Sequence, residues 1–217
     1  MRSAGLRVFS FIMILALAAL ACATPSMDSI LNPMPKDDFS SDGSGWGTGT
    51  DSDKSVEYAN GALEMNVYTP FYVTWSTPDI KPYENVHIEA SVTNASSDPK
   101  AKVGIVCNEQ GSTTAFYYVG VSADGYYAFI KSSITEKDVY LKEGTSDVIS
   151  SASAGSMRLG LDCSGSALTL FVNGQQIDTV SDSTYTSGTI GLFAAADEQN
   201  GGASAAFDDF VVTKLGQ

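Results

Sequence analysis

The chain has 217 residues, of which 12 are basic and 25 acidic, so its formal charge is −13. Residues 1–21 contain two arginines and no acid, and without them 10 basic residues stand against 25 acidic ones, a formal charge of −15. A surface this acidic repels phosphate groups, which excludes nucleic acid and anionic lipid head groups as partners.

The beginning of the chain has the pattern of an export signal. Arg2 and Arg7 flank the start of an uncharged apolar run, VFSFIMILALAAL, and this arrangement is typical of a secretory signal. A membrane-spanning helix needs about 20 apolar residues, more than this run offers. The run ends in ALAC at 19–22, which is similar to a bacterial lipobox, whose cysteine is lipidated. We predict a signal peptide over 1–21 and lipidation of Cys22; the alternative is an ordinary cleavage site.

Two further segments complete the expected organisation. Residues 22–36 contain three prolines and no hydrophobic periodicity, so we expect a lipidated N-terminus and tether. Residues 37–217 have the length of one domain with a substantial core. The predicted location is the bacterial cell envelope, with the membrane contacted through the lipid anchor only.

Short strands dominate the expected secondary structure. Apolar and polar residues alternate in VHIEASVT at 86–93, which predicts a strand with one face in water. His87, the single histidine, falls on that wet face, where we expect it to be solvated. Similar β-branched and aromatic runs predict strands at 63–67, 71–77, 103–107, 114–121, 126–131, 190–194 and 205–213. With no convincing amphipathic helix among them, the fold class is all-β, an antiparallel β-sandwich or barrel.

Asn173–Gly174 is the strongest hairpin signal, because a type I′ turn needs a positive φ at both positions. A two-residue turn there pairs Val172 with Gln175 and Leu170 with Ile177. The preceding turn, around Ser164–Ser166, has two plausible registers, and they place the same residues on one face. That inward face carries Leu159, Leu161, Cys163, Leu168, Leu170 and Val172.

The alternation also directs both remaining cysteines inward. Cys163 lies on the inward face, and Cys107 follows Val103 and Ile105 at the same spacing. In an exported sandwich this predicts a Cys107–Cys163 disulfide, whose loop of about 55 residues would stabilise the fold by roughly 4 kcal/mol. Two free buried thiols are the alternative.

A second hairpin is predicted at Asp124–Gly125. A two-residue turn pairs Val121 with Ala128 and Val119 with Ile130, which forms an apolar core face. The outward face then collects Phe116, Tyr118, Gly120, Tyr127, Phe129 and Lys131. In the Asn173–Gly174 hairpin the outward set is Arg158, Gly160, Asp162, Thr169, Phe171, Gln176 and Asp178.

Aromatic rings beside amides, carboxylates and an arginine suit a sugar, whose apolar face stacks on rings while its hydroxyls need polar partners. The predicted ligand-binding residues are Tyr118, Tyr127, Phe129, Lys131, Arg158, Asp162, Phe171, Gln176 and Asp178. The alternative is that these rings are simply good strand residues and that a loop covers the face.

Several stretches carry a family resemblance: FYYVGVSADGYYAFIK, MRLGLDC, SGTIGLFA and AAFDDFVVTK. They resemble concanavalin A-like/laminin G-like jelly rolls, and more narrowly bacterial lipoproteins with a 3-keto-disaccharide hydrolase-like domain. DDF…GW at 37–46 is similar to the start of that domain. The resemblance covers residues 37–214 and implies a jelly roll that is commonly associated with carbohydrate.

The resemblance also implies that the first and last strands are neighbours, which would bring Asp38 close to Asp209. Clustered carboxylates suit calcium, a hard cation that prefers oxygen, so these two residues are candidate ligands of a structural calcium. Solvated acids at a strand edge are the alternative, and the one that the pattern favours. Asp51 and Asp53 form a second candidate, although they lack the glycine and distal glutamate of an EF-hand loop.

No motif indicates catalysis. A glycoside hydrolase needs two positioned carboxylates, and the Glu-x-Asp-x-x-Glu strand of laminarinase-type relatives is absent, as are phosphate-binding, nucleophile-elbow and zinc motifs. An unfamiliar pair such as Asp162 and Asp178 stays open. We therefore predict an exported, lipid-anchored, non-catalytic protein that binds a glycan or other cell-surface ligand. The alternatives are a protein-binding or envelope-structural module and a glycan-cleaving enzyme of the 3-keto-disaccharide hydrolase-like type.

Overall fold

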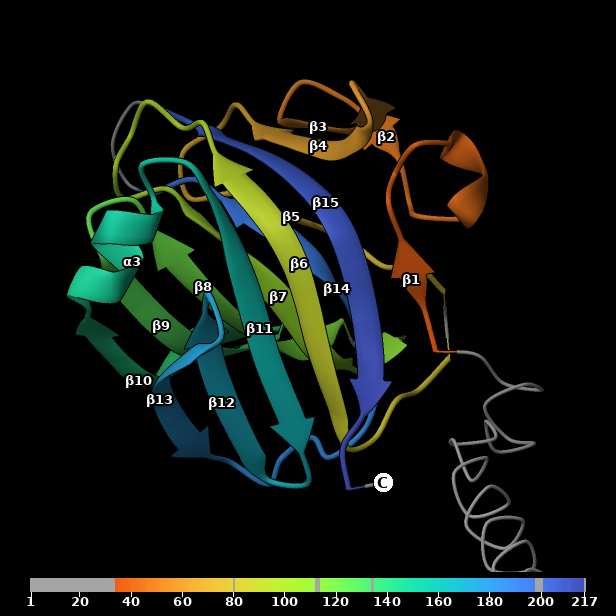
Figure 1. The fold of residues 1–217 in the computed structure, drawn as a ribbon, viewed down its shortest axis with the longest axis vertical. Helices are drawn as coiled ribbons and strands as arrows, with labels where there is room; N and C mark the ends of the chain where they lie inside the picture. Colours follow the sequence, from red (N-terminus) through yellow and green to blue (C-terminus); the bar gives the residue numbers. More distant parts are fainter. Residues whose placement is uncertain (1–33, 80, 112–113, 134, 198–200, 217) are drawn as a thin grey trace, which may run out of the picture. The chain divides into compact units, whose positions relative to one another are not determined.

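The computed structural model describes residues 34–79, 81–111, 114–133, 135–197 and 201–216. The predicted signal peptide and the lipidated Cys22 lie outside these residues. Pro35–Gln217 forms one compact unit, which consists almost entirely of strands (Figure 1). Within the described ranges, no helix has the length and apolarity needed to cross a membrane.

One antiparallel sheet contains nine strands. Its order is β13 (Gln175–Ser181), β12 (Ala167–Val172), β11 (Ser156–Ser164), β6 (Val86–Asn94), β15 (Ala203–Lys214), β4 (Ala62–Val67), β3 (Lys54–Ala59) and β2 (Gly49–Thr50). The ninth strand, β1 (Lys36–Asp37), pairs with Phe210 and Val211 of β15. β4 pairs with an earlier part of β15, residues 203–207. The first and last strands are therefore neighbours, as the resemblance implied.

The other antiparallel sheet contains six strands. Its order is β10 (Glu136–Thr145), β9 (Tyr126–Ser133), β8 (Ala115–Ser122), β7 (Lys102–Glu109), β14 (Thr189–Ala195) and β5 (Val73–Ser76). A short helix, α3 (Asp147–Ala152), follows β10, and a 3₁₀ turn, η1 (Asp42–Ser44), follows β1. The predicted all-β antiparallel sandwich is confirmed, with a strand at each predicted position. The elements that were not predicted are β2, β3, β10, η1 and α3.

The core lies between the two sheets. Ile88 and Leu161 of the nine-stranded sheet are fully buried, and so is Phe129 of the six-stranded sheet. A disulfide joins Cys107 of β7 to Cys163 of β11, which confirms the predicted pair. Because this bond crosses from one sheet to the other, it identifies the face of each sheet that points inward.

The Asn173–Gly174 hairpin forms as predicted at its turn. Asn173 has φ 51° and Gly174 has φ 77°, and Val172 pairs with Gln175. A β-bulge between Leu170 and Phe171 then shifts the register, so that Leu170 pairs with Asp178 rather than with Ile177. A bulge inserts an extra residue and re-aims the side chains that follow it, and this one directs Asp178 toward the six-stranded sheet.

The predicted register of the Asp124–Gly125 hairpin is wrong by one residue. Gly125 has φ 95°, but Asp124 is not in the positive-φ region, so the turn is not type I′. Val121 pairs with Tyr127, which leaves a three-residue loop ending in a glycine with positive φ, the next most common hairpin geometry. A slip of one residue moves every side chain of β9 to the opposite face.

Candidate functional site

The outer face of the six-stranded sheet carries a cluster of aromatic rings. Because Cys107 points inward, its neighbour Val106 points outward, and Val106 pairs with Tyr118 of β8. The ring centroids are separated by 5.0 Å for Trp75 and Phe116, 5.8 Å for Phe116 and Tyr118, and 5.1 Å for Tyr118 and Phe193. We call these four residues the aromatic floor.

Two glycines on neighbouring strands make room for the floor. Gly104 of β7 pairs with Gly120 of β8, and the ring of Phe193 lies against both. A Cβ atom would lie 2.7 Å from Cε1 of Phe193 at Gly104 and 2.5 Å from its Cζ at Gly120. Either side chain would collide with the ring, so the glycines allow Phe193 to lie close to the sheet.

A pocket of about 320 Å³ opens at one end of this face. It is lined by Lys100, Lys102, Ser122, Asp124, Tyr126, Tyr140, Glu143 and Asp197. These residues come from the start of β7, the β8–β9 turn, the end of β10 and the segment after β14. We call it the Tyr126 pocket; none of its residues was among the predicted ligand-binding residues.

The charges in the Tyr126 pocket are arranged around its tyrosines. Lys102 Nζ lies 3.1 Å from Asp197 Oδ2 and 5.6 Å from the centre of the Tyr126 ring. The Tyr126 hydroxyl donates to Glu143 Oε2 at 2.5 Å. Burial, followed by this hydrogen bond, raises the pKa of Tyr126 well above its usual value, so the hydroxyl stays protonated. Tyr140 keeps 52% of its surface exposed.

Tyr118 of the floor is also a neutral donor. Its hydroxyl donates to Asp138 Oδ2, and Asp138 Oδ1 accepts a 2.6 Å hydrogen bond from Ser132. Burial, with the hydrogen bond to Asp138, raises the pKa of Tyr118 far above its usual range. The side chain is only 4% exposed, so it packs within the aromatic floor and offers little surface to a ligand.

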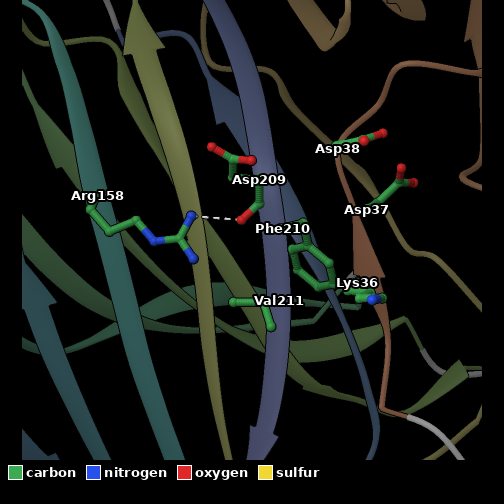
Figure 2. Close-up of a pocket in the computed structure, with 7 residues that line it drawn as sticks. All are labelled: Lys36, Asp37, Asp38, Arg158, Asp209, Phe210 and Val211. Atoms are coloured by element: carbon green, nitrogen blue, oxygen red, sulfur yellow. Dashed lines mark hydrogen bonds between the residues drawn. The ribbon is translucent and has the colours of Figure 1, made fainter.

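A second pocket, of about 480 Å³, lies on the nine-stranded sheet beside β1 and β15 (Figure 2). It is lined by Lys36, Asp37, Asp38, Arg158, Asp209, Phe210 and Val211. Asp209 has φ 49° at an irregularity of β15, and its carbonyl oxygen accepts a 2.6 Å hydrogen bond from Arg158 Nη1. Arg158 Nη2 lies 3.2 Å from Glu89 Oε2. The guanidinium is therefore held on two sides.

The structure brings together the two residues predicted to bind calcium, because Asp38 and Asp209 line the same pocket. Their carboxylates do not point toward each other in Figure 2. Ser40 donates to Asp38 from its hydroxyl and from its backbone, and both bonds lower the pKa of that carboxyl. In the described part of the chain, no three His, Cys, Asp or Glu residues are grouped to hold a metal. Calcium binding stays a prediction.

The nine predicted ligand-binding residues do not share one face. Tyr118 lies in the aromatic floor. The residues at or near the gap between the sheets are Tyr127, Phe129, Lys131 and Asp178. Those on the outer side of the nine-stranded sheet are Arg158, Asp162, Phe171 and Gln176. The single outward face predicted from the two hairpins was wrong, because the hairpins belong to different sheets, whose outer faces lie on opposite sides of the sandwich. The slip in β9 and the bulge in β12–β13 also turn the side chains of β9 and of Asp178 inward.

Polar groups at the margin of the sandwich tie the two sheets together. Asp178 Oδ2 accepts a 2.6 Å hydrogen bond from the Tyr127 hydroxyl, and Asp178 Oδ1 lies 2.5 Å from Lys142 Nζ. Asp182 pairs in the same way with Tyr117, at 2.5 Å, and with Lys131, at 3.0 Å. Tyr127, Lys131 and Asp178 therefore stabilise the contact between the sheets.

His87 lies on the outer face of the nine-stranded sheet, as predicted, but it is not simply solvated. Its Nδ1 lies 2.5 Å from Asp162 Oδ1 and its Nε2 lies 3.3 Å from Glu89 Oε1. The ring also contacts Phe171 edge-on, at 5.6 Å between centroids. With 23% of its side chain exposed, His87 is a member of a polar network.

Comparison with known proteins identifies the architecture. No family model and no curated protein matches the chain. Among solved structures, the carbohydrate-binding module CBM66 from Bacillus subtilis has a TM-score of 0.60 at 14% identity, over 79% of this chain and 96% of that one. A protein of unknown function with a galectin-like fold from Bacillus subtilis has a TM-score of 0.62 at 13% identity, over 83% and 94%.

A β-glucanase from Bacillus licheniformis has a TM-score of 0.57 at 12% identity, and the match covers 84% of this chain and 98% of that one. The fold is a concanavalin A-like jelly roll. At this level of identity the similarity concerns the fold alone. The chemistry of a site on this fold depends on the residues of the individual protein.

Proposed function

We propose that this protein is an exported, lipid-anchored, non-catalytic carbohydrate-binding protein whose site is the Tyr126 pocket. The observation that carries the proposal is the chemistry of the lining, in which two tyrosines border amines, carboxylates and a hydroxyl. A sugar ring has an apolar face that packs on an aromatic ring and hydroxyls that need directional partners. A concave site with few convergent polar groups is also the usual form of a ligand site.

The pocket on the nine-stranded sheet fits a sugar less well. Its single aromatic residue, Phe210, is only 1% exposed, because its ring packs against Trp46. The pocket therefore lacks an open ring for stacking.

The similar structures support the same proposal at the level of the fold. One bears the name of a carbohydrate-binding module and another that of a β-glucanase. A fold is no proof of activity, so a glycan-cleaving enzyme of the 3-keto-disaccharide hydrolase-like type and a protein-binding or envelope-structural module are the competing functions.

Binding to a glycan array, followed by calorimetry with each retained sugar, tests the proposal. We expect Tyr126→Ala to weaken binding about tenfold, the cost of one lost aromatic contact of about 1.4 kcal/mol. Gln176→Ala, on the outer face of the other sheet, is the matched control and should bind as wild type does. If wild type retains no glycan, a protein-binding or structural role replaces this one.

The same samples distinguish binding from catalysis. Chromatography of retained oligosaccharides after incubation should show no shorter products. Release of sugar that is lost in Glu143→Gln or Asp197→Asn would instead assign an enzyme to this pocket, because glycoside hydrolysis depends on paired carboxylates.

Export and anchoring are proposed from the apolar N-terminal run and from ALAC at 19–22. The Cys107–Cys163 disulfide is consistent with an oxidising compartment. We expect Cys22→Ala to move the protein from the membrane fraction to the soluble fraction and to abolish incorporation of labelled palmitate. Unchanged membrane association of this variant would contradict lipid anchoring.

A further inference from the structure

Phe71 has two unusual properties at once. It is the most exposed large apolar residue among those described, with 71% of its surface accessible, and its backbone has φ 59°. It follows Pro70 in a turn, and in a type II turn the position after proline has positive φ and is usually Gly or Asn. A bulky residue there is strained, and strained residues are concentrated at functional sites.

The turn that carries Phe71 is held on both sides. The backbone N–H of Tyr68 donates to the carbonyl of Asp53 at 2.8 Å, and the Thr69 hydroxyl donates to Asp53 Oδ1 at 2.7 Å. After the turn, the carbonyl of Tyr72 accepts a 3.0 Å bond from Ala196. The ring is therefore presented on an anchored loop, which lowers the entropy cost of binding through it.

Phe71 lies at the same end of the six-stranded sheet as the Tyr126 pocket. Ala195 of β14 pairs with Val73 of β5 on one side and with Lys102 of β7 on the other. Lys102 lines the Tyr126 pocket, and Phe71 comes two residues before Val73. With neighbouring strands about 4.8 Å apart, β5 and β9 are separated by about 19 Å across this end.

We infer that Phe71 is a second aromatic contact for the glycan held in the Tyr126 pocket, so that the ligand is an extended chain of sugars. This rests on the proposed function. A mono- or disaccharide packed on Tyr126 of β9 is too short to span the about 19 Å to β5. A longer chain crosses the end of the sheet and packs one of its rings on Phe71.

Calorimetry with chains of different length tests the inference. The probes are disaccharides and hexasaccharides of β-glucan, xylan and fructan, and the protein is the full chain with Cys22→Ala. We expect Phe71→Ala to weaken hexasaccharide binding about tenfold and to leave disaccharide binding unchanged. Tyr126→Ala should weaken both, and Phe71→Trp should restore the hexasaccharide affinity.

The outcomes separate the two proposals. If wild type binds the hexasaccharide and Phe71→Ala binds it equally well, the inference is overturned and the proposed function stands. If wild type binds no probe and retains no glycan on the array, the proposed function fails and this inference fails with it. Flotation with phosphatidylcholine vesicles is a second measurement. If wild type floats with the vesicles and Phe71→Ala does not, Phe71 contacts a membrane surface and the inference is overturned.

Discussion

The ring of Phe193 occupies the space above Gly120 on the outer face of the six-stranded sheet. A Cβ atom at Gly120 would lie 2.5 Å from Cζ of Phe193, well inside van der Waals contact. Phe193 is fully buried although it points away from the core between the sheets. The neighbouring rings and the paired glycines thus form a second packed layer, which supports the proposed binding face.

Replacing Gly120 with Ala should destabilise the protein by about 1–3 kcal/mol, because the added methyl group forces Phe193 out of its position. Urea denaturation measures the loss. Gly155→Ala is the control, since nothing lies within 4 Å of a Cβ atom built there. Equal stability of the two variants would contradict the packing described for Phe193.

Removing the disulfide should cost about 4 kcal/mol, because Cys107 and Cys163 are 56 residues apart and their bond restricts a long loop of the unfolded chain. The Cys107→Ala/Cys163→Ala double variant, compared with wild type in urea, gives this value. Mass spectrometry of unreduced peptides checks the bond itself. Complete alkylation of both cysteines in denatured, unreduced protein would show that it does not form.

Asp182 should make stability depend on acid pH. Burial by itself raises its pKa, but hydrogen bonds from Thr184, Tyr117 and Lys131 outweigh burial and hold that pKa well below 3.8. A carboxylate whose pKa is lower in the folded state stabilises the fold above its unfolded pKa and loses this contribution as pH falls through the folded value. Stability should therefore fall below about pH 4.

The Asp182→Asn variant isolates this contribution. Its destabilisation relative to wild type should be largest near neutral pH and should shrink below about pH 4, as measured by urea midpoints across a pH series. Asp42→Asn, at an exposed carboxylate, should follow the wild-type curve. A gap between Asp182→Asn and wild type that is constant with pH would contradict the assignment.

Tyr117 should limit stability at the other end of the pH range. Burial, followed by the hydrogen bond to Asp182, raises its pKa to about 12. A raised pKa in the folded state stabilises the fold below the unfolded value of about 10 and loses this contribution as pH rises through about 12. Between about pH 10 and about pH 12, Tyr117→Phe should therefore lose less stability than wild type. Urea titrations at these pH values measure the loss. An identical loss in both proteins would count against the hydrogen bond between Tyr117 and Asp182.

Phe71→Asn should stabilise the protein by about 1 kcal/mol, because asparagine tolerates the positive φ that strains phenylalanine. Thermal denaturation measures the gain. The same variant should lose hexasaccharide affinity as Phe71→Ala does, so stability and binding change in opposite directions. A lower melting temperature for Phe71→Asn would show that the ring stabilises the fold instead.

Much of the architecture is determined locally and could therefore be predicted from the sequence. Alternation with a period of two located the strands, and the sequence pattern of Asn173–Gly174 specified a turn in which both residues have positive φ. The inward direction of Cys107 and Cys163 followed from the same alternation. These features depend on residues within a few positions of one another, so no distant contact is needed to specify them.

The location of the proposed site was decided only by the tertiary structure. The two predicted hairpins belong to different sheets, so their outer faces lie on opposite sides of the sandwich. The three-residue loop at Gly125 and the bulge after Leu170 each change the register by one residue and turn further predicted ligand-binding residues inward. The Tyr126 pocket joins residues from 100 to 197, and they meet because strand order brings β7, β9, β10 and β14 together. Strand pairing over such separations depends on the packing of the whole core, which local pattern does not encode.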